Sequence, residues 1–127
     1  MSLEPGLEAT VTHVVTDADT APEVGSGDVP VLATPRLLAL MEAATVAAVR
    51  DRLPPGATTV GTHIALTHDA PTFVGGRVEV TARLDAVDGP LLVFGVRAAG
   101  CGEARVERHV VDRDRFLRRA ENAAQRE

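Results

Sequence analysis

The sequence contains no lysine, tyrosine or tryptophan, and its 127 residues include only three phenylalanines and one cysteine. Without lysine, neither Schiff-base chemistry nor a P-loop nucleotide site is available. Because aromatic side chains are so few, valine, leucine and alanine must fill the core, and these residues suit β-strands and an alanine-rich helix. Cys101 has no second thiol for a disulfide or a zinc site, so a turn residue is the preferred interpretation and a catalytic nucleophile the weaker one.

The charge of the chain excludes further classes of protein. The formal net charge is −5, which is not the basic footprint of a nucleic-acid-binding protein. No apolar run is long enough to span a membrane, and the N-terminus has no secretory signal pattern. We therefore expect a cytoplasmic protein with no nucleic-acid or membrane partner. No pair of His or Cys residues has metal-ligand spacing, so we also expect no metal site.

The length and composition predict one compact domain. Hydrophobic residues make up 45% of the chain and charged residues 24%, which is ordinary for a globular protein. A chain of this length suits a single domain. We expect that domain to cover residues 1–112 and to be followed by a charged tail, residues 113–127, that forms a frayed helix.

A strand, a long loop and a helix are predicted in the first half of the chain. Residues 6–16 alternate loosely and predict a strand, and residues 17–33 are rich in Asp, Pro, Gly and Ser, which is typical of a surface loop. A helix is predicted from Pro35 to about Leu53, with Thr34 as its N-cap. This helix is apolar over most of its circumference, so we expect it to be buried on nearly all sides.

Four strands are predicted in the second half, at residues 58–69, 77–87, 91–99 and 103–112. The turns between them are short, which implies antiparallel neighbours. A buried helix followed by such a meander predicts an α+β hotdog fold, in which an antiparallel sheet wraps around a central helix. One sheet leaves such a helix partly uncovered, so we expect a homodimer, with a tetramer as a further possibility.

Glu42 is the most informative residue of the predicted helix. It is the only acidic residue between Pro35 and Arg50, and no basic residue lies three or four positions away. A carboxylate on so apolar a helix is costly to desolvate unless it is hydrogen-bonded, and catalytic acids and bases are often in that state. A glutamate on a narrow solvent-facing stripe is the alternative, and the helix alone does not decide between the two.

Three other residues have both a structural and a functional interpretation. Thr34 suits a plain N-cap, but it lies at a helix N-terminus that can bind an oxyanion, about 12 Å along the helix from Glu42. The parity of residues 60–68 places His68 on an apolar strand face, as a core histidine or as a general acid or base. Arg108 also points inward by parity. A structural ion pair with a buried carboxylate is preferred there over a contact with a phosphate of acyl-CoA.

Three stretches of the chain resemble one known family. The sequences ATPRLLALMEAATVAAVRDRL, VGTHIALTHDAPTFVGGRVEVTARL and EARVERHVV are similar to the fluoroacetyl-CoA thioesterase family of hotdog proteins. The resemblance covers most of residues 30–112. It implies a CoA thioester as substrate and hydrolysis to a free acid and CoA, with no cofactor beyond the CoA of the substrate itself.

The resemblance also implies roles for individual residues. The family has a Thr just before the central helix, a Glu eight residues later and a His in a Thr-His motif, which fall on Thr34, Glu42 and His68. Glu42 would attack the carbonyl or activate water, His68 would assist proton transfer, and Thr34 would stabilise the oxyanion. The family's strand glycine and its arginine in the last strand fall on Gly61 and Arg108, as substrate-binding residues at a dimer interface.

One departure from the family limits the expected substrate. The fluoroacetyl-CoA enzyme has Phe residues in the loop before the helix, whereas that loop here reads APEVGSGDVPVLA and has no aromatic residue. We therefore expect a general short-chain acyl-CoA thioesterase. A non-catalytic acyl-CoA-binding module on the same fold is the alternative. A hotdog dehydratase is a weaker one, because that chemistry usually pairs an Asp with a His.

Overall fold

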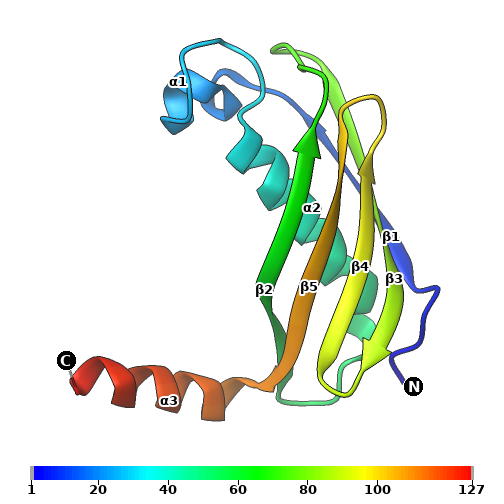
Figure 1. Ribbon diagram of the computed structural model, residues 1–127, viewed down its shortest axis with the longest axis vertical. Helices are drawn as coiled ribbons and strands as arrows, with labels where there is room; N and C mark the ends of the chain where they lie inside the picture. The colour runs from blue at the N-terminus through cyan, green and yellow to red at the C-terminus, as the bar shows by residue number, and fades with distance from the viewer. Residues whose placement is uncertain (1, 127) are drawn as a thin grey trace.

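The computed structural model describes residues 2–126 and shows one curved sheet wrapped around one long helix (Figure 1). The sheet is antiparallel throughout, with the strand order β1-β3-β4-β5-β2. This is the predicted α+β architecture. In chain order the elements are β1 (Glu8–Val14), η1 (Asp17–Asp19), α1 (Ala21–Val24), α2 (Thr34–Val49), η2 (Arg50–Arg52), β2 (Ala57–His68), β3 (Arg77–Asp88), β4 (Leu91–Ala98), β5 (Gly102–Asp112) and α3 (Arg113–Gln125).

The core lies between α2 and the concave face of the sheet. Phe94 of β4 is its largest fully buried side chain, and its register partners Leu84 and Val106 on the two neighbouring strands are also fully buried. Each such side chain contributes roughly 1.5–3 kcal/mol by leaving water. From α2 the core receives Leu37, Met41, Ala44 and Val49. Aliphatic side chains therefore fill most of this core, as the composition predicts.

The central helix is less covered than its sequence predicts. Pro35, Ala39, Ala43 and Val46 form an exposed stripe along α2, with Val46 37% exposed. The expectation that this helix is buried on nearly all sides is therefore wrong for the single chain, because one sheet covers only one side of a helix. We call these four residues the uncovered stripe.

The start of α2 also differs from the prediction. Thr34 is the first helical residue, and Ala33 holds the N-cap position without any side-chain cap. The expectation that Thr34 is the N-cap is thus wrong. Its hydroxyl bonds to another segment of the chain instead, and Pro35 follows at the second position of the helix, where a missing N–H costs nothing.

Two β-bulges reverse which residues face the core. In β2 the register shifts between Gly61 and His63, so that Thr62 is an extra residue. Gly61 and Ile64 pair with Arg108 and Val106, which are both buried. The predicted single face running through Val60 and Thr62 to His68 is therefore wrong before the bulge, although it holds for the residues from Ile64 onward.

The second bulge lies in β3 between Leu84 and Ala86. Leu84 is buried, but Ala86 is exposed, so the prediction that Ala86 continues the core face of this strand is wrong. The extra residue Asp85 changes the alternation at this point, and Val87, rather than Ala86, pairs with the buried Leu92.

Residues 17–33, the pre-helix segment, are more ordered than a surface loop. The segment holds η1 and α1, and single β-bridges join Thr20 to Leu32 and Val31 to Phe73. It folds over the N-terminal end of α2 (Figure 1).

The charged tail forms the helix α3, which extends away from the sheet and is exposed along its length (Figure 1). The carboxylate of Asp112 caps it by accepting from the Arg115 N–H at 3.0 Å. A domain boundary at residue 112 stays a prediction. No helix within residues 2–126 is long and apolar enough to cross a membrane.

Candidate active site

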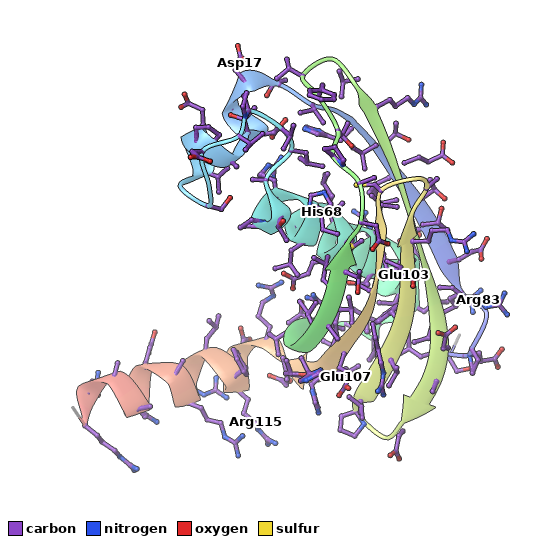
Figure 2. The ribbon with its side chains drawn as sticks, turned by 45° about the horizontal axis from the view of Figure 1, so that its top comes forward. Asp17, His68, Arg83, Glu103, Glu107 and Arg115 are labelled. Atoms are coloured by element: carbon purple, nitrogen blue, oxygen red, sulfur yellow. The ribbon has the colours of Figure 1, made fainter. Side chains whose placement is uncertain are left out.

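Thr34 and His68 meet where the start of α2 lies against the end of β2. The Thr34 hydroxyl oxygen is 2.8 Å from Nδ1 of His68, and either group can be the donor, depending on the imidazole tautomer. Thr34 faces this way because it is the first residue of the helix. His68 does so because Ile64, Leu66 and His68 share the concave face of the sheet after the bulge. Figure 2 shows His68 beside this end of α2.

The second ring nitrogen of His68 is buried and bonds to nothing within the described residues. Nε2 has almost no exposed surface and no hydrogen-bond partner there. Buried polar atoms are nearly always paired, so an orphaned one calls for a functional explanation. An imidazole nitrogen without a partner can give or take a proton once a ligand reaches it.

A pocket of about 320 Å³ adjoins this pair, between the pre-helix segment and the loop that follows β2. Thr34 and His68 lie in its wall, with Val29 and Leu32 on one side and Asp69 on the other. The described residues that line it include no aromatic side chain. A larger groove, of about 730 Å³, lies on the outer face of the sheet around Arg83 and Glu103 (Figure 2). It contains none of the predicted site residues.

Glu42 and Arg108 form an ion pair farther along α2. Arg108 Nη1 donates to Glu42 Oε2 at 3.1 Å, and the two side chains are 8% and 33% exposed for Arg108 and Glu42 respectively. Arg108 also donates from Nε to the Thr59 hydroxyl at 2.9 Å and from Nη2 to the Thr59 carbonyl at 3.1 Å. The preferred ion pair of Arg108 is thus observed, although its carboxylate partner is only half-buried, and β5 supplies the base that Glu42 lacks one turn away on α2. The guanidinium is engaged within the chain on all three of its nitrogens.

Gly61 lies directly against this ion pair. A Cβ atom at position 61 would be 2.5 Å from Glu42 Oε2 and 3.3 Å from Arg108 Nη1. The first of these separations is too short for any real Cβ contact. A side chain at position 61 would therefore force the end of the Glu42 side chain to move away from the strand.

The structure divides the five predicted residues into two groups. Thr34 bonds to His68, and Glu42 contacts Arg108 and Gly61. Within residues 2–126 no hydrogen bond or ion pair joins one group to the other, in line with the separation of about 12 Å along the helix. Both groups lie between α2 and the β2 edge of the sheet, beside the side of the helix that carries the uncovered stripe.

Sequence reasoning missed a third cluster, centred on Asp19 in η1. Its carboxylate is buried and lies 2.7 Å from His13 Nε2 and 2.9 Å from Arg36 Nε. Burial alone raises the pKa of Asp19, but hydrogen bonds from the Thr16 backbone, His13, Arg36 and the Thr16 hydroxyl outweigh it and hold that pKa well below its usual range. The capping-box spacing of Thr16 and Asp19 is a pattern that could have revealed part of this cluster.

Comparisons with known proteins identify the family. Residues 15–114 match the family described as FlK, fluoroacetyl-CoA-specific thioesterase. The chain belongs to this family. A curated member, the fluoroacetyl-CoA thioesterase of Streptantibioticus cattleyicolor, is 39% identical over 90 residues, which cover 68% of this chain and 65% of that protein. The match thus spans a little under two thirds of the curated relative.

Solved structures extend this family likeness to almost the whole chain. A structure of the fluoroacetyl-CoA thioesterase FlK has a TM-score of 0.90 at 31% identity, covering 96% of this chain and 98% of that one. A thioesterase superfamily member from Thermus thermophilus has a TM-score of 0.84 at 25% identity, with 98% and 97% covered. A hot-dog-like protein from Thermanaerovibrio acidaminovorans, at 22% identity and a TM-score of 0.83, supports the fold alone. The predicted family and the predicted hotdog fold are both confirmed.

Proposed function

We propose that this member of the fluoroacetyl-CoA-specific thioesterase family hydrolyses a short acyl-CoA to the free acid and CoA. In this proposal Thr34, Glu42 and His68 are catalytic, Gly61 binds the thioester carbonyl, and Arg108 holds Glu42 in place. Solved variants of FlK in complex with fluoroacetate and CoA, or with acetyl-CoA, support a CoA thioester as the substrate class.

The observation that carries the proposal is the pair of Thr34 and His68 beside the pocket. The imidazole is anchored through Nδ1, while Nε2 is buried and unbonded within the described residues. A histidine held by one nitrogen and free at the other suits proton transfer to a leaving group. The departing CoA sulfur is such a group, because the thiolate must gain a proton as the carbon–sulfur bond breaks.

Glu42 supplies the carboxylate that acts either as the nucleophile or as the general base. Its carboxylate can attack the thioester carbon, which gives an acyl-glutamyl anhydride and releases the CoA thiolate, and water then hydrolyses the anhydride. Alternatively, the carboxylate takes a proton from water as that water attacks the same carbon. Both routes consume one water and yield one acid and one CoA. In both, the ion pair with Arg108 aims the carboxylate at the carbonyl.

The developing oxyanion requires hydrogen-bond donors. The Thr34 hydroxyl lies in the pocket wall, and the first turn of α2 presents backbone N–H groups that lack partners within the helix. Gly61 offers a backbone N–H that no side chain of its own obstructs. Donors that are already in place before the reaction stabilise a transition state without reorganisation.

A homodimer explains why one chain holds the site in two groups. The uncovered stripe leaves four apolar or small residues of α2 exposed next to both groups. A second copy packed on this side buries the stripe and closes the space between Glu42 and His68 with its own surface. The catalytic residues of one site then come from two chains, as closed two-fold symmetry allows.

The pocket suggests a small acyl group that carries no further functional group. Its volume of about 320 Å³ is at the lower end for small-molecule sites, and small or aliphatic residues form most of its wall. The pre-helix segment carries no aromatic residue to lie over the acyl group. We therefore expect acetyl, propionyl and butyryl thioesters to be accepted, with no selectivity for the fluorinated acid.

The test is release of free CoA from acetyl-, fluoroacetyl-, propionyl-, butyryl- and phenylacetyl-CoA. For the best substrate, Glu42→Gln is expected to lower kcat/KM by at least about a hundredfold, because it removes the nucleophile or base. Glu103→Gln on the outer face of the sheet is the matched control and keeps full activity. Full activity in Glu42→Gln would remove Glu42 from the mechanism.

Binding without turnover is the outcome that favours the alternative function. If acyl-CoA raises the Tm but every thioester stays intact, the chain is an acyl-CoA-binding module on the same fold. The unbonded His68 Nε2 favours catalysis over that alternative, because simple binding of an acyl chain needs no proton donor or acceptor.

A further inference from the structure

Asp19 is a buried carboxylate that takes no part in the proposed chemistry. Its side chain is 5% exposed. Oδ2 accepts from the Thr16 N–H at 2.8 Å and the Thr16 hydroxyl at 3.1 Å and lies 2.7 Å from His13 Nε2, while Oδ1 accepts from Arg36 Nε at 2.9 Å. Burying a charge is costly unless its hydrogen bonds are satisfied. Asp19 is therefore held in place by hydrogen-bond partners from β1, the turn after it and α2.

The backbone of Asp19 adds a second connection to the start of α2. Its carbonyl accepts from the Ala33 N–H at 2.9 Å. Asp19 thus holds the residue just before Thr34 through its backbone, and Arg36, two residues after Thr34, through its side chain. Thr34 lies between these two attachments, and neither Asp19 nor Arg36 lines the pocket.

We propose that Asp19 is a positioning residue that aims the Thr34 hydroxyl at His68. The proposal rests on the proposed function in one respect, namely that this hydroxyl and imidazole act in catalysis. The hydroxyl-to-imidazole distance is 2.8 Å, so a shift of about 1 Å in the first turn of α2 breaks the bond. In Figure 2 the stretch that carries Asp17 lies over the N-terminal end of α2, and His68 lies beside the same end.

The first test asks whether Asp19 acts through Thr34. Asp19→Asn keeps the size of the side chain but replaces an acceptor oxygen with an NH₂ group, which faces a donor on either side. We expect kcat to fall about tenfold to a hundredfold with little change in KM, because the hydroxyl is displaced rather than lost. In a Thr34→Ala background the same change should cost less than about threefold. Losses that multiply independently would overturn the proposal.

A control variant separates positioning from loss of stability. Val80→Ala removes two methyl groups from the core of β3, where Val80 is fully buried, and lowers Tm without touching the pre-helix segment. All variants are assayed well below their Tm values. If Val80→Ala with a similar Tm loses kcat to the same extent, the effect of Asp19→Asn is general destabilisation and the proposal fails.

A second variant keeps the test available if Asp19→Asn does not fold. The Arg36 side chain is 37% exposed, and Arg36→Met removes only one of the hydrogen bonds to Asp19. We expect a smaller fall in kcat, of about threefold to tenfold, that again disappears in the Thr34→Ala background. Unchanged kcat in Arg36→Met would count against the proposal.

A readout that needs no substrate distinguishes this proposal from the proposed function. The ¹⁵N shifts of the His68 ring, assigned with His68→Gln, report the bond at Nδ1. We expect Asp19→Asn and Thr34→Ala to move them in the same direction and Val80→Ala to leave them in place. If the shifts move but no thioester is hydrolysed, the proposed function fails and the positioning role stands. If hydrolysis is found and Asp19→Asn leaves the shifts unchanged, the positioning role fails alone.

Discussion

A side chain at position 61 would displace the Glu42 carboxylate, because a Cβ atom there would lie 2.5 Å from Glu42 Oε2. The Glu42 carboxylate lies where a methyl group at position 61 would be, and Arg108 binds the carboxylate from the neighbouring strand. This arrangement holds Glu42 Oε2 in one orientation, against an Arg108 side chain that is itself buried. The position of the Glu42 carboxylate therefore depends on the absence of a side chain at position 61.

Gly61→Ala should accordingly disturb Glu42 more than the fold. The new methyl group must displace Oε2 and weaken its bond to Arg108, which costs about 1.5–3 kcal/mol for a charged hydrogen bond. We expect kcat/KM to fall at least about tenfold. Thioester hydrolysis and urea unfolding measure the two effects. Thr62→Ala, on the opposite face of β2, is the control, and an equal loss of activity there would contradict this explanation.

Sequence reasoning identified Glu42 because the helix offered it no partner, and the structure supplied that partner from elsewhere. Arg108 is 66 residues away in the chain, and only its parity on the last strand suggested a buried ion pair. Thr34 was assigned the wrong structural role. A Thr before a Pro fits an N-cap, but a hydrogen bond to His68 of another element decides where its hydroxyl points.

At the scale of elements, the strands and the helix were predictable and the bulges were not. Every predicted strand overlaps an observed one, because alternation and turn residues are local properties of the sequence. The bulge at Thr62 leaves no such trace. The β-branched residues Val60, Thr62 and Ile64 stand at every second position, so the pattern looks regular while the pairing with β5 shifts by one residue. Only the partner strand reveals the shift.

The pre-helix segment was predicted as a loop because its interactions are long-range. Asp19 bonds to His13 before the segment and to Arg36 after it. The pKa of Asp19 is held below its ordinary value of 3.8, so its carboxylate stabilises the fold above that pH and loses this contribution as the pH falls through its lower folded value. The basic side chains of His13 and Arg36 face this carboxylate.

The stabilising effect of Asp19 should therefore disappear in acid. At pH 7 we expect Asp19→Asn to lower Tm by about 5–10 °C, since bonds to a buried carboxylate are lost. This difference from the unmodified chain should narrow between about pH 5 and about pH 2, because the unfolded chain takes up a proton there that the folded carboxylate, with its lowered pKa, does not bind. Calorimetry across this range measures it, with exposed Asp51→Asn as the control. A difference in Tm that stays constant down to about pH 2 would contradict this prediction.

At the scale of the whole molecule, the uncovered stripe is the feature that a single chain does not explain. Ala39 and Ala43 lie at the centre of the stripe, and Val46 is 37% exposed. The helix sequence predicted burial on nearly all sides of α2, whereas one sheet leaves the stripe exposed, and burial of the stripe by a second copy stays a prediction. Fold class followed from element order, whereas assembly depends on surfaces that meet only between chains.

Ala39→Arg is expected to keep the chain monomeric. A guanidinium at the centre of the stripe must be desolvated when two copies pack together, which opposes association by several kcal/mol. Sedimentation velocity should show a dimer for the unmodified chain and a monomer for the variant, with activity falling in parallel. Ala86→Arg, on the outer face of β3, should remain dimeric and active. A monomeric unmodified chain with full activity would refute the shared site.

Because β2 contains an extra residue, the effect of deleting one residue from this strand depends on where the deletion falls. Deleting Thr62 alone would restore regular alternation and leave Gly61 and Ile64 on the same side, each opposite its present partner in β5. Deleting Ala65 instead would turn one half of the strand over and send either the glycine or the imidazole to solvent. Homologues whose β2 is one residue shorter should therefore lack a residue at the bulge, Thr62 or His63, and a deletion scan of the strand should find tolerance there.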